Sequence, residues 1–394
     1  MAANNRVYYA IQQVAFAKHS GGAGGTRIAA HGVQSVGITT TFNLEQVFEL
    51  GQLAIYENIE GTPDIEVTMS KVLDGYIPLY CLASADQTDG PQLNKRTLAR
   101  SFVQLGIWGE AFESAGQSSS TAATWVEMSG LYVSSLGYNF PLDDNFSEDI
   151  TLVGNAKLWG EGQGQNTLNC TPKYRPTAVA GAFAGNSDGP IGSGGVNRRE
   201  NMYIANTTAK ATGSDYYDYT VLPQDIYGVG SSGEVSGTAH IASITVSADI
   251  GREDLFELGS KVPYAKTVTF PLEVTCDIEL TTTSGDMIDV VDECSGNTLS
   301  ACQSPSNLTD RAIRLSTCEG LRLYLGIKNK LASVTYGGGD AGGGNATVTY
   351  SYSTFNDFTV IHSGDTNANG GSTSGASWYT NRKDYLAPSG DGWR

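Results

Sequence analysis

The sequence predicts a mainly β protein made of two tandem units, each a β-sandwich or barrel with a flanking helix. Three observations support this prediction. The 394-residue chain has 48 glycines and 20 tyrosines but only 16% charged residues, a composition typical of β proteins with many turns. Segment 64–72 alternates between apolar and polar residues, as a half-buried strand does. Finally, short motifs recur in the same order in both halves of the chain.

The repeat is centred on Phe48-Glu49-Leu50-Gly51, which recurs as Phe256-Glu257-Leu258-Gly259, 208 residues later. Upstream, at the same offset, Val33, Ser35, Val36 and Glu45 align with Ile241, Ser243, Ile244 and Glu253. Downstream, Ile65-Glu66-Val67-Thr68 aligns with Leu272-Glu273-Val274-Thr275, slipped by one residue. Matches before, within and after one motif indicate an internal duplication, which halves the number of chains needed for a symmetric ring.

The first unit is expected over 33–165, after an N-terminal arm over 1–32 that contains a first strand near Val7–Phe16. Its expected elements are, in order, a strand over 33–42, a long connection over 43–63, a strand over 64–72, a helix over about 92–104, and strands beginning at Gly130 and Asp149. The helix is predicted from the four-residue spacing of Leu98 and Phe102. The connection over 43–63 is long for a loop and therefore suggests a function.

The second unit is expected over 233–365 with the same order of elements: a strand over 242–248, a connection over 250–264, a strand over 268–280, a short helix over 308–315, a strand at Gly320 that corresponds to the one at Gly130, and last strands over 347–361. Between the units, residues 166–232 are rich in Gly, Ser, Asn and Thr and are interpreted as an inserted linker or surface excursion. Residues 366–394 form a C-terminal tail of similar composition.

Charge and cysteine content exclude several classes of protein. With 24 basic and 41 acidic residues the net charge is −17, so the chain repels phosphate and is not expected to bind nucleic acid by charge. The N-terminus lacks the basic and apolar regions of a signal peptide, and no apolar run is long enough to span a membrane. The cysteines are therefore expected to be reduced, although Cys294 and Cys302 are close enough in sequence to pair across a loop.

No motif predicts catalysis, a cofactor or a metal. The four histidines are far apart, and Gly337-x-Gly339-x-x-Gly342 lies in a glycine run with no helix after it, as expected for a hairpin tip. The acidic group Asp143, Asp144, Glu148 and Asp149 lacks the spacing of an EF-hand and is interpreted as a turn rather than a calcium site. The chain is therefore predicted not to be an enzyme.

The residues with the best case for a function are apolar side chains in the two long connections. An isolated chain has little core within reach of these connections, so we expect the side chains to be buried on assembly. They are Phe48, Leu50, Leu53, Ile55, Tyr56, Leu255, Phe256 and Leu258. Arg198 and Arg199, the most basic local pair, are interpreted as an anchor for an acidic neighbouring subunit, with a solvated pair beside Glu200 as the alternative.

The order of strand, long loop, returning strand and helix resembles bacteriophage tail tube (major tail) proteins in a duplicated version. The residues that carry the resemblance are Val33–Thr41, Val47-Phe48-Glu49-Leu50-Gly51 and Asp64–Val72, and it covers both units. It implies a virion protein, assembled in the host cytoplasm, that forms trimeric, pseudo-hexameric rings stacked into a tube. The implied partners are further copies of the chain, with sheath, tape-measure and tail-terminator proteins as further candidates. DNA would pass through an acidic lumen without specific binding, and no membrane would be involved.

Two other classes stay open from the sequence alone. A carbohydrate- or receptor-binding phage surface or decoration protein would show Trp or Tyr clustered on a concave face. A β-rich carbohydrate enzyme would need two carboxylates facing each other in a cleft.

Overall fold

The computed structural model is mainly β, which confirms the predicted fold class. It describes residues 6–7, 9, 12–19, 28–51, 53–86, 92–108, 122, 124–161, 195–204, 240–282, 285–286, 288, 310–311, 313–317, 320–326, 328–339 and 344–362. Most of 166–232, the tail over 366–394, Cys294 and Cys302 lie outside these residues. No helix among the described residues is long and apolar enough to cross a membrane.

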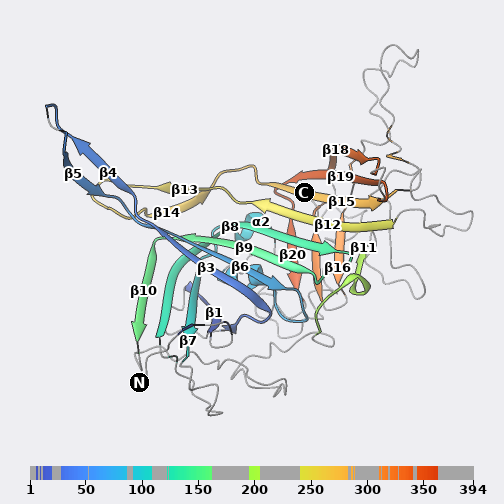
Figure 1. The fold of residues 1–394 in the computed structure, drawn as a ribbon, viewed down its shortest axis with the longest axis horizontal. Helices are drawn as coiled ribbons and strands as arrows, with labels where there is room; N and C mark the ends of the chain where they lie inside the picture. Colours follow the sequence, from blue (N-terminus) through green and yellow to red (C-terminus); the bar gives the residue numbers. More distant parts are fainter. Residues whose placement is uncertain are drawn as a thin grey trace, which may run out of the picture.

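Eight antiparallel strands lie side by side and form what we call the main sheet (Figure 1). Four come from the part of the chain before residue 166, called the first half, and four from the part after 239, called the second half. In spatial order they are β3 (Val33–Thr41), β6 (Asp64–Val72), β9 (Ser147–Gly154), β8 (Thr124–Pro141), β12 (His240–Asp249), β15 (Glu273–Thr281), β19 (Thr347–Phe355) and β18 (Lys330–Gly337). The pairing of β8 with β12 joins the two halves into one surface.

A second set of strands runs crosswise to the main sheet (Figure 1). In the first half these strands are β1 (Gln12–Lys18), β2 (Ile28–Ala29), β7 (Ser101–Ile107), the first part of β8, and β10 (Ala156–Glu161). In the second half they are β16 (Arg314–Thr317), β17 (Leu321–Tyr324) and β20 (Thr359–His362), and β11 (Met202–Ile204), from the segment between the halves, pairs with β16. Strand β8 contributes to both sets and changes partners next to Gly130, whose φ of 68° favours glycine.

One hydrophobic cluster extends through both halves on the inner face of the main sheet. In β6, Ile65, Val67 and Met69 are buried, whereas Asp64, Glu66 and Thr68 are exposed. The apolar residues of the sequence therefore lie on the inner face of this strand and the polar residues on its outer face. Val246, Cys276 and Tyr350 continue the cluster in β12, β15 and β19, and the short helix α1 (Leu79–Ala83) packs against β1, β7, β8, β9 and β20.

The two halves have the same strand order. In the main sheet β3-β6-β9-β8 is followed by β12-β15-β19-β18, and among the crosswise strands β1-β7-β8-β10 matches β11-β16-β17-β20. The irregularities match too: the pairing register shifts between Val33 and Ser35 and between Ile241 and Ser243. It also shifts between Val133 and Ser135 and between Leu331 and Ser333. Because bulges occupy defined places in a strand, they fix which positions correspond.

These pairings correct the sequence alignment in two places. Thr40 pairs with Ile65 and Ala248 pairs with Val274, so Val274 rather than Leu272 takes the place of Ile65. A slip of two residues preserves the alternation, so the apolar pattern alone could not detect it. The strand after Gly320 is crosswise strand β17, and the strand that takes the main-sheet place of β8 is β18, which the sequence analysis did not predict.

The predicted helices are also corrected. Only Leu93–Arg96 (α2) is helical within 92–104, and β7 begins at Ser101. In the second half Arg314 and Leu315 belong to β16, and no α-helix occurs among its described residues. Strands β7 (SFVQLGI) and β16 (RLST) are buried on both faces although they contain polar residues, so neither shows the apolar–polar alternation that marks a half-buried strand.

Both long connections are β-hairpins that project from the same side of the molecule (Figure 1). The first consists of β4 (Leu44–Phe48) and β5 (Ile55–Glu60), and the second of β13 (Arg252–Leu255) and β14 (Ala265–Val268). The described part of the inserted segment, 195–204, contains the 3-10 helix Arg199–Asn201 and strand β11, which takes the place among the crosswise strands that β1 has in the first half.

Candidate functional surface

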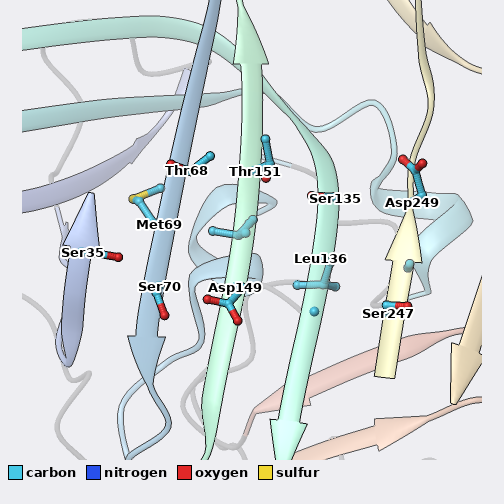
Figure 2. A pocket seen from close by; sticks show the side chains of 13 residues that line it. Ser35, Thr68, Met69, Ser70, Ser135, Leu136, Asp149, Thr151, Ser247 and Asp249 are labelled. Carbon is cyan, nitrogen blue, oxygen red and sulfur yellow. The ribbon is translucent and has the colours of Figure 1, made fainter. Parts of the chain in front are cut away.

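The outer face of the main sheet is lined by small hydroxyl-bearing side chains and carboxylates. Figure 2 shows part of it, where Ser35, Thr68, Thr151, Ser135 and Ser247 lie on neighbouring strands β3, β6, β9, β8 and β12. The same alternation continues in β19, where Thr349, Ser351 and Ser353 alternate with the buried Tyr350 and Tyr352. A sheet with one face in the core and one in water alternates in this way. Here the solvent-facing side chains are mostly short and polar in both halves of the chain.

The strand registers place these side chains in rows that cross the whole sheet. One row consists of Ser35, Ser70, Asp149, Gly137, Ser247, Thr275, Ser353 and Lys330. Within it, the Ser247 and Thr275 hydroxyls are 2.7 Å apart, and two rows further along the same face the Ser243 hydroxyl donates to Glu279 Oε2 at 2.8 Å. Hydrogen bonds of this kind stabilise the pairing of neighbouring strands. The result is a polar surface with few protruding groups.

Carboxylates dominate the charge of this face. They are Asp64, Glu66, Asp149, Asp249, Glu273, Asp277 and Glu279, which come from both halves. Among the described strand residues of the outer face, Lys330 is the cation, and it lies on edge strand β18, 3.0 Å from Asp310. Charges of one sign spread over a surface repel polyanions.

The outer face is hollowed where the two halves meet. An open pocket spans β3, β6, β9, β8 and β12 and is lined by Ser, Thr and Asp residues together with apolar residues such as Met69 and Leu136, with Asp149 and Asp249 on either side of β8 (Figure 2). This hollow carries no convergent set of catalytic groups, and the described residues contain no cluster of His, Cys, Asp or Glu suited to a metal.

The predicted acidic group does not come together as one site. Glu148 points into the core, where Oε2 accepts from the Leu79 amide at 2.6 Å and Oε1 accepts from the Tyr80 amide and the Tyr138 hydroxyl, both at 3.0 Å. Asp149 lies on the outer face, and Asp143 and Asp144 lie in the β8–β9 turn. Glu148 therefore holds the start of α1 on the sheet rather than binding a cation. Burial raises the pKa of this carboxyl.

The apolar residues predicted as an interface are exposed at the hairpins. Leu50 and Leu53 in the first hairpin and Leu258 in the second are fully exposed, and Phe48 and Phe256 are 61% and 59% exposed. Ile55 and Tyr56 are exposed as well, and Leu255 is partly buried. Gly51 and Gly259, which correspond in the repeat, have φ values of 93° and 92°, so both hairpin tips use the same left-handed turn position.

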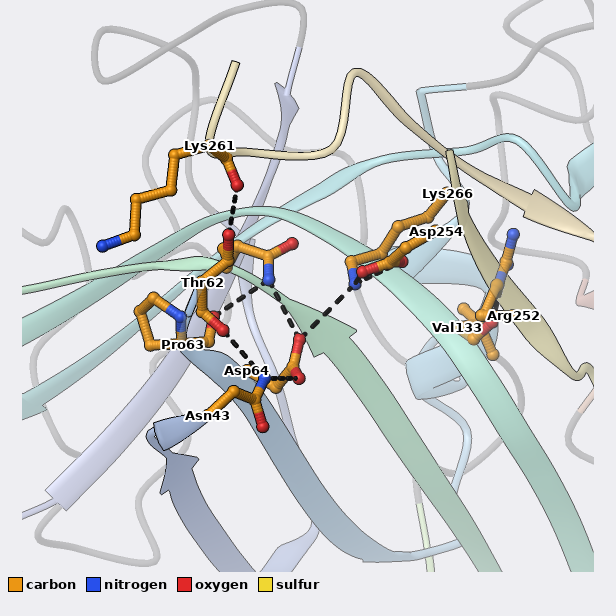
Figure 3. Close-up of polar contacts among 10 residues, drawn as sticks. Asn43, Thr62, Pro63, Asp64, Val133, Arg252, Asp254, Lys261 and Lys266 are labelled. Carbon is orange, nitrogen blue, oxygen red and sulfur yellow. Dashed lines mark hydrogen bonds and ion pairs between the residues drawn. The ribbon is translucent and has the colours of Figure 1, made fainter. Parts of the chain in front are cut away.

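The root of the second hairpin is anchored to the first half (Figure 3). Arg252 donates to the Val133 and Thr97 carbonyl oxygens. Lys266 is 2.6 Å from Asp254 and 3.8 Å from Asp64. The Thr62 hydroxyl also donates to the Lys261 carbonyl oxygen. These contacts fix the second hairpin beside the end of the first.

Arg198 and Arg199 lie on the surface and contact residues of the β8–β9 turn. Arg198 Nε donates to Asn145 Oδ1 at 3.0 Å, and Arg199 Nη1 is 3.5 Å from Asp143 Oδ1. Both thus contact their own chain, and an anchoring role toward another subunit stays a prediction. The lining residues of the outer face were not predicted from the sequence, although Ser and Thr at every second position over 243–247 in β12 and 347–353 in β19 were a usable signal.

Comparisons with known proteins add little to this description. No family model matches the sequence, and no curated protein matches it. One chain in the cryo-EM structure of the anti-feeding prophage (AFP) baseplate aligns with 41% of this chain and 98% of its own length, at 11% identity and a TM-score of 0.30. A chain from the AFP tube terminating cap aligns with 41% and 95%, at 12% identity and a TM-score of 0.30. This level of similarity identifies no family, and the function is inferred from the geometry of the surface.

Proposed function

We propose that this chain is a structural subunit of a bacteriophage tail tube, which assembles into stacked trimeric rings around a channel for DNA. The observation that carries the proposal is the main sheet. It is continuous across both halves, polar and acidic on its outer face, and ends on both sides in strands with one neighbour each among the described strands, β3 and β18.

Ring formation follows from the chemistry of those end strands. A long strand at a sheet edge exposes a row of unpaired backbone N–H and C=O groups, which soluble proteins usually cover or protect. Closing several copies into a ring pairs every edge. Since each chain supplies two runs of identical strand order, three chains provide six equivalent runs, which supports a trimer with pseudo-sixfold symmetry.

The outer face is proposed to line the channel. Duplex DNA carries one negative charge about every 1.7 Å along its axis, so a cationic lining would hold it by releasing counterions. Carboxylates such as Glu66, Asp149 and Asp277 instead repel the phosphates. Short hydroxyl side chains keep the wall smooth and give water a continuous polar surface. DNA would therefore pass without specific binding.

The two hairpins are proposed to contact neighbouring subunits or the next ring. Their tips carry Leu50, Leu53 and Leu258, which are fully exposed in a single chain. Burying one such side chain stabilises an assembly by roughly 1.5–3 kcal/mol. Flanking carboxylates, among them Glu49 and Glu257, would discourage premature association.

The alternative, a carbohydrate- or receptor-binding surface protein, is less well supported. It requires aromatic side chains clustered on a concave face. Among the described strands of the outer face, Tyr132 and Phe355 are separated by β12 and β15.

Electron microscopy of the purified protein, together with a mass measurement in solution, tests the proposal. The expected result is rings or tubes with a central channel and three chains per ring. Isolated monomers, or rings of six complete chains, would overturn it.

A further inference from the structure

We propose that β18 of one copy pairs antiparallel with β3 of the next copy, in the register that the β8–β12 junction already uses inside each chain. This inference deepens the proposed function and rests on it. The partner is a second copy of the same chain, and the register specifies which residues of β18 face which residues of β3 across the boundary between copies.

The internal junction supplies the template. Strand β8 ends the four-stranded run of the first half, and β12 begins that of the second half. Across this junction Ser135 is opposite Asp249 and Gly137 is opposite Ser247. The contact between two runs of the same order is thus already present once in each chain, with a defined direction and register.

The bulges show which positions of edge strands β18 and β3 correspond to positions of β8 and β12. The shift between Val133 and Ser135 in β8 matches the one between Leu331 and Ser333 in β18, since both occur in the pairing with the next strand inward. The shift between Val33 and Ser35 in β3 matches that between Ile241 and Ser243 in β12. Ser333 therefore corresponds to Ser135, and Thr41 corresponds to Asp249.

The transferred register brings specific pairs together. Ser333 of one copy lies opposite Thr41 of the next, and Thr335 lies opposite Thr39. On the inner face, Tyr336 lies opposite Ile38, as Tyr138 lies opposite Val246 inside the chain. Tyr336 is 52% exposed in a single copy, whereas Tyr138 is 1% exposed, so pairing would cover a side chain that the isolated chain leaves in water.

The charge distribution fits a copy-to-copy contact. The facing outer residues, Ser333, Thr335, Thr39 and Thr41, are uncharged hydroxyls, whereas the carboxylates of the face lie on the inner strands β6, β9, β12 and β15. Like charges opposite each other destabilise a strand pair. An acidic chain that pairs with itself needs edges without facing carboxylates, and the facing residues of β3 and β18 meet this requirement.

Cysteine pairs test this register in the full-length protein. Directly opposite residues have Cβ atoms about 4.5–5.5 Å apart and diagonal neighbours about 7–8 Å, so disulfide formation distinguishes the two. The test variant carries Ser333→Cys with Thr41→Cys. The matched internal control carries Ser135→Cys with Asp249→Cys, and the off-register control carries Ser333→Cys with Thr39→Cys. The unsubstituted chain accounts for the native cysteines.

Assembled samples are oxidised and separated under non-reducing denaturing conditions. We expect the test variant to give covalently linked dimers and trimers, the internal control to give a linked monomer, and the off-register variant to stay unlinked. A cryo-EM map of the unsubstituted assembly should show Thr335 opposite Thr39. Rings in which the internal control is linked and the test variant is not, or a map with a shifted register, would overturn the inference and leave the proposed function intact. If the unsubstituted protein forms no rings, both fail.

Discussion

Arg252 donates two hydrogen bonds to the carbonyl oxygen of Val133, from Nε at 2.9 Å and from Nη2 at 2.6 Å. A third bond, from Nη1 at 2.6 Å, goes to the Thr97 carbonyl oxygen, and the guanidinium lies 5.1 Å from the centre of the Tyr132 ring. The position that corresponds to Arg252 in the first hairpin is Leu44, which is exposed and has no such donors. The two hairpins share a place in the fold but differ in how their roots are held.

Replacing Arg252 with Met should therefore loosen the second hairpin. Burial lowers the pKa of Arg252 to about 10, so the side chain stays charged at neutral pH. Its removal leaves the Val133 and Thr97 carbonyls without these donors, which should cost about 1–3 kcal/mol in the free energy of unfolding. Denaturant unfolding checks the cost, and hydrogen exchange should rise over 252–268. The matched control Arg199→Met removes an exposed arginine and should change neither; equal effects of both variants would contradict this account.

A second prediction concerns Glu148, which accepts hydrogen bonds from two amides and a hydroxyl in the core. In Glu148→Gln the amide nitrogen turns N–H groups towards one or more of these donors. We expect a loss of about 1–3 kcal/mol in the free energy of unfolding, because a buried donor is left without an acceptor. Thermal or denaturant unfolding measures it. Wild-type stability in the variant would show that α1 is held by its apolar contacts alone.

The same residue predicts a pH dependence. Burial raises the pKa of Glu148 in the folded chain above the ordinary glutamate value of about 4.3. The folded state therefore binds the proton more tightly than the unfolded state. The contribution of protonation to stability is complete below the ordinary pKa and is lost as pH rises through the raised folded pKa. The stability of the wild type relative to Glu148→Gln, measured across this window, should fall with rising pH; a difference that is flat or rises would refute the assignment.

The hairpin tips yield a prediction about assembly. Replacing Phe48 and Phe256 together with Ser should leave folded subunits that no longer form long tubes, because both side chains are exposed in the single chain and are proposed to be buried between subunits. Circular dichroism checks the fold, and electron microscopy checks tube length. Leu98→Ser, an equally exposed apolar residue outside the hairpins, is the control and should assemble normally. Wild-type tube length in the double variant would mean that the hairpins are not assembly contacts.

The charge of the outer face can be reversed at two of its positions. Tubes of Asp149→Lys with Asp277→Lys should retain duplex DNA at low salt and release it as salt rises, because lysines in a confined channel attract phosphates and release counterions. Co-sedimentation of a labelled duplex with the tubes measures retention. The control pair Asp143→Lys with Asp144→Lys changes the same net charge in the β8–β9 turn, outside the strands of the outer face. Equal retention by both variants would place the DNA path elsewhere.

The sequence by itself determined the local patterns. Alternation over 64–72 located β6, and the recurrence of Phe-Glu-Leu-Gly located two hairpin tips whose glycines share one backbone conformation. It failed in β7 and β16, where both faces are buried and polar residues such as Gln104 and Arg314 lie in the interior, so the sequence shows no alternation between a buried and a solvent face. It also placed Leu272 where Val274 belongs, since a shift by two leaves every side chain on the same face.

Only the tertiary structure decided how the patterns combine. Residues as distant as Ser35, Asp149 and Lys330 lie in one row because hydrogen bonding between strands, rather than proximity in sequence, sets their register. Nothing local in Gly137 or Ser247 indicates that β8 and β12 would join two halves into one sheet. Side-chain alternation is a property of one strand and can be read from its residues, whereas strand order depends on long-range backbone pairing, which almost any residue can make.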